Sequence, residues 1–92
     1  MKQEKVCYHL NVSGDVQGVF FRVSAKDEAE KLGLTGYARN EADGSVAIEV
    51  EGSQADIKEF IKWAESGPKH ARVNHVSAKS APLQHYASFT VL

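Results

Sequence analysis

Residues 6–22 read VCYHLNVSGDVQGVFFR, and three patterns follow one another along this stretch. Its first eight residues place an apolar side chain at every second position, which is typical of a strand with one apolar face. Gly14 and Gly18 then bound a short loop. Beyond the loop, apolar residues recur at helical spacing until Gly33, which predicts a helix over residues 22–33. The stretch therefore predicts a strand, a glycine-bounded loop and a helix in direct succession.

The next part of the sequence predicts a hairpin of two strands. Residues 34–40 form the first of them, and the turn-forming sequence NEADG follows at residues 40–44. The second strand begins near Val46, where apolar and other residues alternate as far as Glu51. We therefore expect an antiparallel pair after the first helix.

A second helix is predicted by its two ends and by one apolar face. Ser53 and Asp56 have the spacing of a capping box, and Gly67-Pro68 closes the pattern. The apolar residues that share one face are Ile57, Phe60, Ile61 and Ala64. Weaker strand patterns follow at residues 73–79 and 89–91. The predicted order is β-α-β-β-α-β plus a short C-terminal strand, which indicates an α+β fold with two helices on one face of a mostly antiparallel sheet.

Length and composition limit the classes of protein to consider. With 92 residues and 42% hydrophobic residues, the chain is expected to form a single domain over residues 1–92. The net charge of −1 leaves no basic surplus for a general nucleic-acid binder. No apolar run approaches the roughly 18 residues of a membrane span. The polar N-terminus leads directly into a strand pattern, so we expect no signal peptide.

The single cysteine, Cys7, excludes an intrachain disulfide and favours a reduced, cytoplasmic protein. We expect it to be a buried, inert thiol. The four histidines, at positions 9, 70, 75 and 85, lack the spacing of a metal site and are expected to be surface or strand residues. No exposed apolar stripe is evident, which favours a monomer.

The glycine-bounded loop and the residue that follows it have the features of an anion site. Gly14 and Gly18 allow main-chain N–H groups to point into one concavity, and the loop leads into a helix N-terminus. Arg22 adds a guanidinium that can hold two phosphate oxygens. The residues alone leave two readings open, an oxyanion site or a plain connecting loop. A Walker A loop is excluded because no Gly-Lys-Ser/Thr follows the glycines.

The same loop, residues 14–22 (GDVQGVFFR), closely resembles the signature loop of the acylphosphatase family. A second block that resembles this family lies at residues 32–40 (LGLTGYARN), and DGSV at 43–46 extends it. The similarity covers nearly the whole chain and includes the SGP sequence at 66–68. This resemblance implies a ferredoxin-like α/β sandwich, in agreement with the predicted order of elements.

The resemblance also implies an activity, the hydrolysis of small-molecule acyl phosphates to a carboxylate and inorganic phosphate, with no metal and no other cofactor. It implies that Arg22 binds the phosphate and that Asn40 positions the attacking water. The rest of the phosphate cradle would come from the loop, namely from Asp15, Val16, Gln17, Gly18, Val19 and Phe20.

Asp15 departs from the family pattern, because many members carry a basic or neutral residue there. A carboxylate that points outward only weakens the local positive potential, and salt screens that effect. A carboxylate that points inward lowers phosphate affinity. Both orientations are open at this point.

The sequence also bears on two other functions. An RNA-binding ferredoxin-like module is disfavoured, because residues 45–51 (SVAIEVE) hold no aromatic residue and both acids, Glu49 and Glu51, are expected to face outward. Phe20, Phe21 and Tyr37 are expected to be packing residues rather than a stacking platform. A regulatory or carrier domain that binds a small anion without catalysis remains an alternative.

Overall fold

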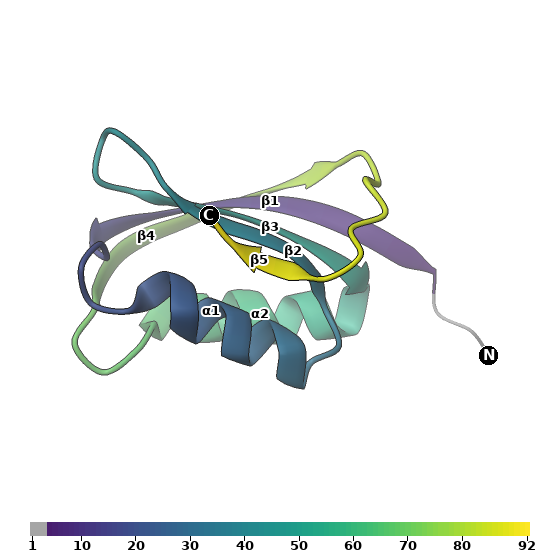
Figure 1. Cartoon of the computed structure of the whole chain (residues 1–92), viewed down its shortest axis with the longest axis horizontal. Coiled ribbons are helices and arrows are strands. Elements are labelled where there is room, and N and C mark those ends of the chain that lie inside the picture. Colours follow the sequence, from purple (N-terminus) through teal and green to yellow (C-terminus); the bar gives the residue numbers. More distant parts are fainter. Residues whose placement is uncertain (1–3) are drawn as a thin grey trace.

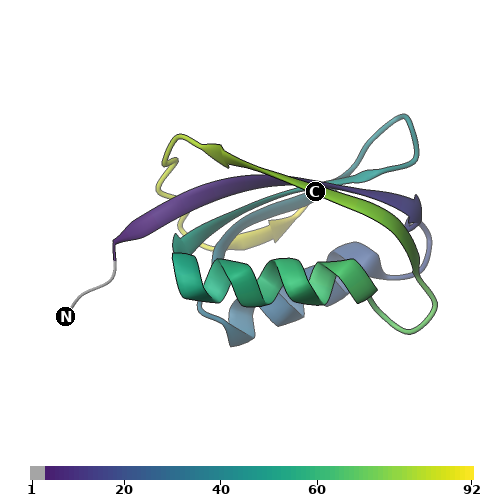
Figure 2. The same cartoon turned by 180° about the vertical axis from the view of Figure 1, so that it is seen from behind.

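The computed structural model describes residues 4–92, and its strands and helices follow one another in the predicted order (Figure 1). The elements are β1 (Lys5–Asp15), α1 (Phe21–Lys31), β2 (Thr35–Asn40), β3 (Val46–Ser53), α2 (Gln54–Ser66), β4 (Arg72–Ala81) and β5 (Phe89–Val91). Both helices cover one face of the sheet, and α2 lies beneath β1 and β4 (Figure 2). The predicted α+β sandwich is confirmed. The boundaries differ from the predicted ones by at most two residues, which is the usual uncertainty at element ends.

The sheet order is β4-β1-β3-β2-β5. Neighbouring strands are antiparallel except for β2 and β5, which are parallel. Because β3 runs opposite to both of its neighbours, β1 and β2 point the same way and end at the same edge of the sheet. Val12 of β1 and Asn40 of β2 are both paired with Val46 of β3. The loop after β1 therefore begins close to the end of β2.

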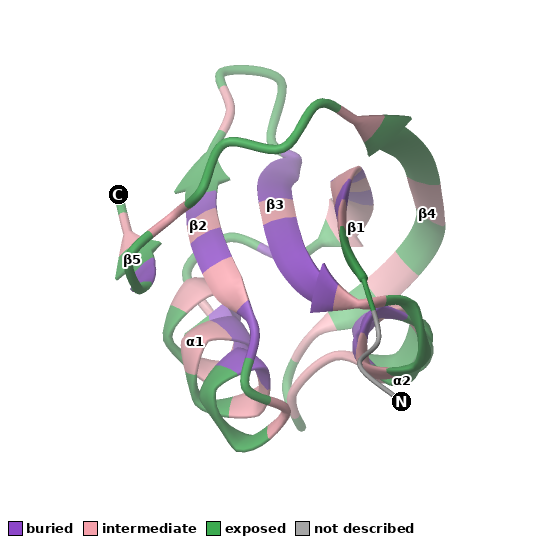
Figure 3. Ribbon diagram, turned by 90° about the vertical axis from the view of Figure 1, so that its right-hand side faces the viewer, coloured by how far each residue is buried: buried purple, intermediate pink, exposed green. Residues whose placement is uncertain are grey.

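The core lies between the sheet and the two helices, as the buried colouring shows (Figure 3). Its side chains come from the alternating apolar positions of the strands and from the apolar faces of the two helices. They include Leu10, Val12, Val46, Ile48, Val50, Phe21, Ala25, Ala29, Ile57, Phe60 and Ala64. Trp63 is half-buried and packs its ring 5.5 Å from that of Phe60 and 5.4 Å from that of Phe21. No helix within residues 4–92 is long and apolar enough to cross a bilayer.

Ser53 caps α2, as its spacing from Asp56 predicts, but Asp56 bonds to the Ser53 hydroxyl and not to the Ser53 main-chain N–H of a full capping box. The main-chain N–H of Asp56 donates to Ser53 Oγ at 3.2 Å, and the Ser53 hydroxyl donates to Asp56 Oδ2 at 2.8 Å. The Ser53 side chain thereby pairs one of the main-chain N–H groups that have no partner within the first turn of α2.

The other face of the sheet is partly covered by the connection between β4 and β5, which corrects one prediction. The alternation in β3 predicts that Glu51 faces solvent, but the residue is only 1% exposed. Its carboxylate accepts main-chain N–H donors from Gln84 at 2.6 Å, His85 at 3.1 Å and Tyr86 at 2.9 Å. The alternation in β3 correctly assigns Glu51 to the face without helices, but a later segment of the chain buries it there.

Glu49 lies on the same face and organises the polar side chains around it. Its carboxylate accepts a hydrogen bond from the Tyr86 hydroxyl, and His9 Nδ1 lies 3.0 Å from its Oε2. Cys7 is buried beside it, as expected, with Sγ 4.0 Å from Glu49 Oε1. Burial, followed by the charges of Glu49 and Glu51, raises the pKa of the Cys7 thiol to about 11. The thiol is therefore inert at neutral pH.

Candidate active site

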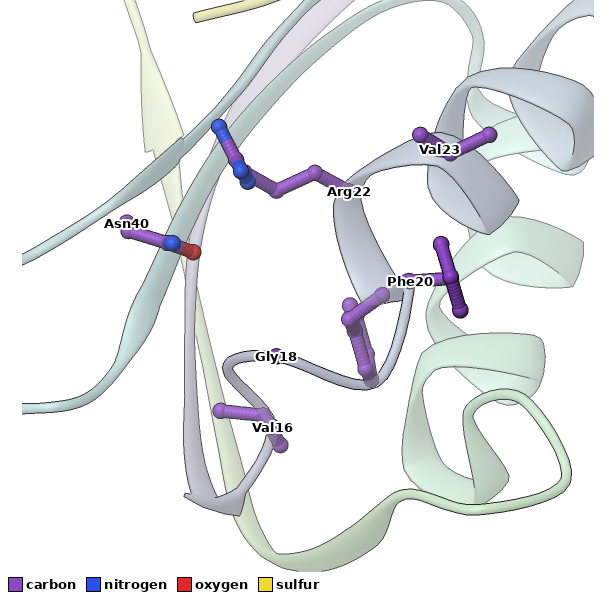
Figure 4. Close-up of a pocket in the computed structure, with 7 residues that line it drawn as sticks. Val16, Gly18, Phe20, Arg22, Val23 and Asn40 are labelled. Atoms are coloured by element: carbon purple, nitrogen blue, oxygen red, sulfur yellow. The ribbon is translucent and has the colours of Figure 1, made fainter.

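A cavity of about 200 Å³ opens at the sheet edge where β1 and β2 end. Figure 4 shows the residues that line it, namely Val16, Gly18, Phe20, Phe21, Arg22, Val23 and Asn40. They come from the loop after β1, from the first turn of α1 and from the end of β2. The structure thus brings together Arg22, Asn40 and the glycine-bounded loop, which are separate in the sequence.

Gly14 and Gly18 give the loop its path. The pairing of β1 with β4 shifts between Ser13 and Gly14, and Gly14 has φ 130°. A Cβ atom at Gly14 would lie 2.1 Å from the main-chain oxygen of Arg72, so only glycine fits there. Gly18 has φ 75°, a left-handed conformation that glycine adopts readily. These two positions allow the chain to leave the sheet and turn back towards α1.

The N-terminus of α1 faces the cavity without a cap. Phe20 is the N-cap residue, and no side chain among residues 4–92 caps the helix there. The first turn also contains no acidic residue. The first main-chain N–H groups of a helix have no partner within the helix, and they carry the positive end of its dipole. This end of α1 therefore favours an anion.

Arg22 and Asn40 point towards one another across the cavity (Figure 4). Asn40 shares a row of the sheet with the buried residues Val12 and Val46, and opposed residues in a sheet project to the same face, so its amide lies on the helix side. Arg22 donates from Nη1 to a main-chain oxygen of Leu92. Leu92 is held beside β2, because its N–H donates to the Ala38 oxygen at 2.9 Å.

The loop is tied to the β2–β3 hairpin by Gln17, a contact that sequence reasoning missed. Gln17 Nε2 donates to the main-chain oxygens of Glu41 at 2.8 Å and Ser45 at 2.9 Å. The hairpin itself is stiffened by Asp43, whose Oδ1 accepts from the Ser45 N–H at 2.9 Å and the Ser45 hydroxyl at 2.6 Å. Those hydrogen bonds, first from the hydroxyl and then from the main chain, lower the pKa of the Asp43 carboxyl. Because Asn40 opens this hairpin, Gln17 links the loop to Asn40.

The residues of the predicted cradle occupy different environments. Of the six loop residues, Val16, Gly18 and Phe20 line the cavity. Val16 is buried, and Val19 packs against the core. The Gln17 side chain is engaged by the hairpin, so a contribution of Gln17 to anion binding would come from its main chain. Asp15 is exposed at the end of β1, opposite Arg72 in the register with β4, and does not line the cavity.

The expectation that Phe20 is a packing residue is wrong. Its side chain is 79% exposed, whereas that of Phe21 is 2% exposed and lies in the core. Phe20 has φ 62°, a left-handed conformation that is uncommon for residues other than glycine. This backbone turn directs the Phe20 ring out of the loop while Phe21 enters the helix and the core.

The cavity presents hydrogen-bond donors and no ionisable base. Its polar side chains are the Arg22 guanidinium and the Asn40 amide, and none of the residues that line it is a histidine, cysteine or carboxylate. Within residues 4–92, no group of three or more His, Cys, Asp and Glu residues is arranged to hold a metal ion. A guanidinium, uncapped helix N–H groups and an amide together suit a tetrahedral oxyanion.

Comparisons with known proteins all point to one family. Residues 8–91 match the model of the family described as Acylphosphatase. A protein named acylphosphatase from Pseudomonas paraeruginosa is 47% identical over 87 residues, which is 95% of this chain and 96% of the relative. The structure of an acylphosphatase from Coxiella burnetii has a TM-score of 0.94 and 37% identity and covers 100% of both chains. That of the Bacillus subtilis acylphosphatase has a TM-score of 0.92 and 31% identity, with 95% and 98% covered.

Proposed function

Because this chain belongs to the acylphosphatase family, we propose that it hydrolyses acyl phosphates in the cavity that Arg22 and Asn40 line. The products are a carboxylate and inorganic phosphate. The observation that carries the proposal is the meeting, at one sheet edge, of an uncapped helix N-terminus, a guanidinium and an amide. Each of these groups donates hydrogen bonds, as a site for a phosphoryl group requires.

Arg22 and the loop hold the phosphoryl group. Its oxygens accept hydrogen bonds from the guanidinium of Arg22 and from main-chain N–H groups of the loop and of the first turn of α1. Hydrogen bonds between charged partners are roughly twice as strong as neutral ones. The first turn of α1 contains no acidic residue, so no carboxylate within that turn offsets this attraction. These donors are fixed before the substrate arrives, so they stabilise the charge on the phosphoryl oxygens in the transition state without reorganisation.

Asn40 holds the attacking water. An amide is not basic at neutral pH, so it orients the water through hydrogen bonds instead of removing its proton. The water oxygen forms a bond to phosphorus as the bond between phosphorus and the acyl oxygen breaks. The leaving carboxylate takes that electron pair, and the proton of the water passes to a phosphoryl oxygen of the substrate. A carboxylate is a good leaving group, so positioning and charge stabilisation are sufficient for this reaction.

Asp15 belongs to the surroundings of the site. It is exposed, it lies outside the cavity, and it faces Arg72 in the neighbouring strand. These features favour the outward orientation, in which the carboxylate weakens the positive potential near the loop without contacting phosphate.

We further propose that the protein acts as a cytoplasmic monomer on a small-molecule substrate. Its free, buried Cys7 thiol is compatible with a reducing compartment. The described chain exposes only a few large hydrophobic residues, which favours a monomer; they are Phe20, Val23, Leu83 and Leu92. The net charge of −1 leaves no basic surplus, which disfavours nucleic acid as a partner.

The test is hydrolysis of benzoyl phosphate by the purified protein in the presence of EDTA. We expect turnover in the parent protein and loss of both substrate binding and turnover in Arg22→Ala. Arg39→Ala is the matched control, because Arg39 pairs with Glu41 outside the cavity, at 3.2 Å. A folded parent protein that does not hydrolyse benzoyl phosphate would contradict the proposal and would support the anion-binding domain without catalysis.

A further inference from the structure

Two large apolar side chains are exposed at the rim of the proposed active site. Phe20 is 79% exposed and Val23 is 50% exposed, and both line the cavity that also contains Arg22 and Asn40. Leu83 and Leu92 are also exposed, at 43% and 54%, but only Phe20 and Val23 line the cavity. The cavity therefore has one side rich in hydrogen-bond donors and one side that is apolar.

The backbone holds Phe20 in this exposed position. Its φ of 62° lies in the left-handed region, which costs energy for a residue with a Cβ atom. Because most of the side chain is exposed, packing within the fold offsets little of that cost. Strained positions of this kind cluster at ligand-binding sites, where the ligand supplies the missing contacts.

Phe20 and Val23 act together as one surface. Both side chains line the cavity, and Figure 4 shows them at the start of α1, on the far side of Arg22 from Asn40. An acyl phosphate has a charged phosphoryl end and an organic acyl end. Once the phosphoryl group is held by Arg22 and the loop, the apolar pair is the surface available to the acyl group.

We propose that Phe20 and Val23 form the acyl subsite and make the protein selective for acyl phosphates with a bulky apolar acyl group over those with a small one. The inference rests on the proposed function, since the phosphoryl group must first occupy the cavity. Contact with Phe20 and Val23 removes apolar surface of both partners from water, and an aromatic acyl group gains a ring–ring interaction as well. A methyl group gains little from the same surface.

The experiment compares benzoyl phosphate with acetyl phosphate, with EDTA present, and measures kcat/KM for each. The readout is the ratio of the two values, which cancels changes that affect both substrates equally. In Phe20→Ala we expect this ratio to fall about three- to tenfold, the size of one aromatic interaction. Phe20→Leu keeps an apolar side chain and is expected to retain part of the ratio. Val23→Thr, which keeps the shape of the side chain on a helix surface, is expected to lower it about twofold.

Leu83→Ala is the matched control, because Leu83 is 43% exposed but lies outside the cavity, and it should leave the ratio at the parent value. An unchanged ratio in both Phe20→Ala and Val23→Thr, with both substrates hydrolysed, would overturn the subsite and leave the proposed function standing. If the parent protein hydrolysed neither substrate, the proposed function itself would be wrong, and the subsite with it.

Discussion

Replacing Glu51 with glutamine should weaken the fold markedly, although Glu51 lies on the face of the sheet without helices. Its buried carboxylate accepts three main-chain N–H groups from the β4–β5 connection, two at Oε2 and one at Oε1. Burial alone would raise the pKa of Glu51, but the three N–H donors outweigh it and hold the pKa below its ordinary value of 4.5. The ionised form is thus the one that the folded state prefers.

The size of the effect follows from the number of donors. In Glu51→Gln, one of the two oxygens becomes an NH₂ group, which cannot accept, so at least one of the three N–H groups loses its partner. A buried donor without a partner costs about 1–3 kcal/mol, and the remaining bonds weaken because their acceptor is no longer charged. We therefore expect the free energy of unfolding to fall by about 2–4 kcal/mol. For a domain of this size, that lowers Tm by roughly 10–20 °C.

Urea denaturation at pH 7 measures this loss, and Glu59→Gln makes the same chemical change on the exposed surface of α2. The pH dependence gives a second check. A carboxyl whose pKa is lower in the folded state stabilises the fold above its unfolded pKa and loses that contribution as the pH falls through the folded pKa. The difference between the parent and Glu51→Gln should therefore be full at pH 7 and shrink as the pH falls below the ordinary carboxyl pKa of 4.5.

Two results would show that the ionised Glu51 carboxylate does not stabilise the fold. One is a Glu51→Gln variant as stable at pH 7 as Glu59→Gln. The other is a loss of stability of the same size at pH 7 and at low pH, which would show that the charge of Glu51 contributes nothing.

Three other predictions concern the loop and the thiol. Gln17→Ala removes two hydrogen bonds to the hairpin, so the free energy of unfolding should fall by about 1–2 kcal/mol and kcat for benzoyl phosphate should fall with it. Asp15→Lys should lower KM about two- to threefold at low ionic strength, with no difference from the parent at high salt, because the two charges act through solvent. Cys7 should not react with Ellman's reagent at pH 8 in the folded protein, since its pKa is about 11, and should react fully after unfolding.

Each of these has a control or an opposite outcome. Gln54→Ala, at an exposed position of α2, should leave both stability and kcat near the parent values. If Gln17→Ala were as close to the parent as Gln54→Ala, the hairpin contact would have no role in stability or turnover. A large decrease of KM in Asp15→Lys that persists at high salt would place the carboxylate inside the cavity. Rapid labelling of Cys7 in the folded protein would show that the face beneath the β4–β5 connection opens readily.

Periodicity and capping signals were sufficient to predict the layers of this fold. The alternation in β1 and β3, the apolar face of α2 and the Ser53 cap are local patterns, and each is observed at the predicted place. The register that joins Val12, Val46 and Asn40 explains why the two sequence blocks of the resemblance form one cavity.

Other features depend on contacts between distant segments and are not encoded in any local pattern. Glu51 is buried by residues 84–86, more than 30 positions later in the chain, so alternation alone could not predict its burial. Gln17 binds main-chain oxygens of the hairpin, which any residue would provide. Phe20 is exposed because its backbone is left-handed, and nothing in the sequence FFR predicts that conformation.

The proposed mechanism gives Arg22 and Asn40 separate roles, and the kinetics of Asn40→Ala test this separation. The measurement is kcat for benzoyl phosphate together with Ki for inorganic phosphate as a competitive inhibitor. We expect kcat to fall about 10²–10³-fold, the effect of losing one well-placed donor in the transition state, while Ki stays within about threefold of the parent value. Asn74→Ala, on an exposed part of β4, should change neither quantity. A Ki that rises as much as kcat falls would make Asn40 a phosphate ligand, and an unchanged kcat would contradict its role in holding the attacking water.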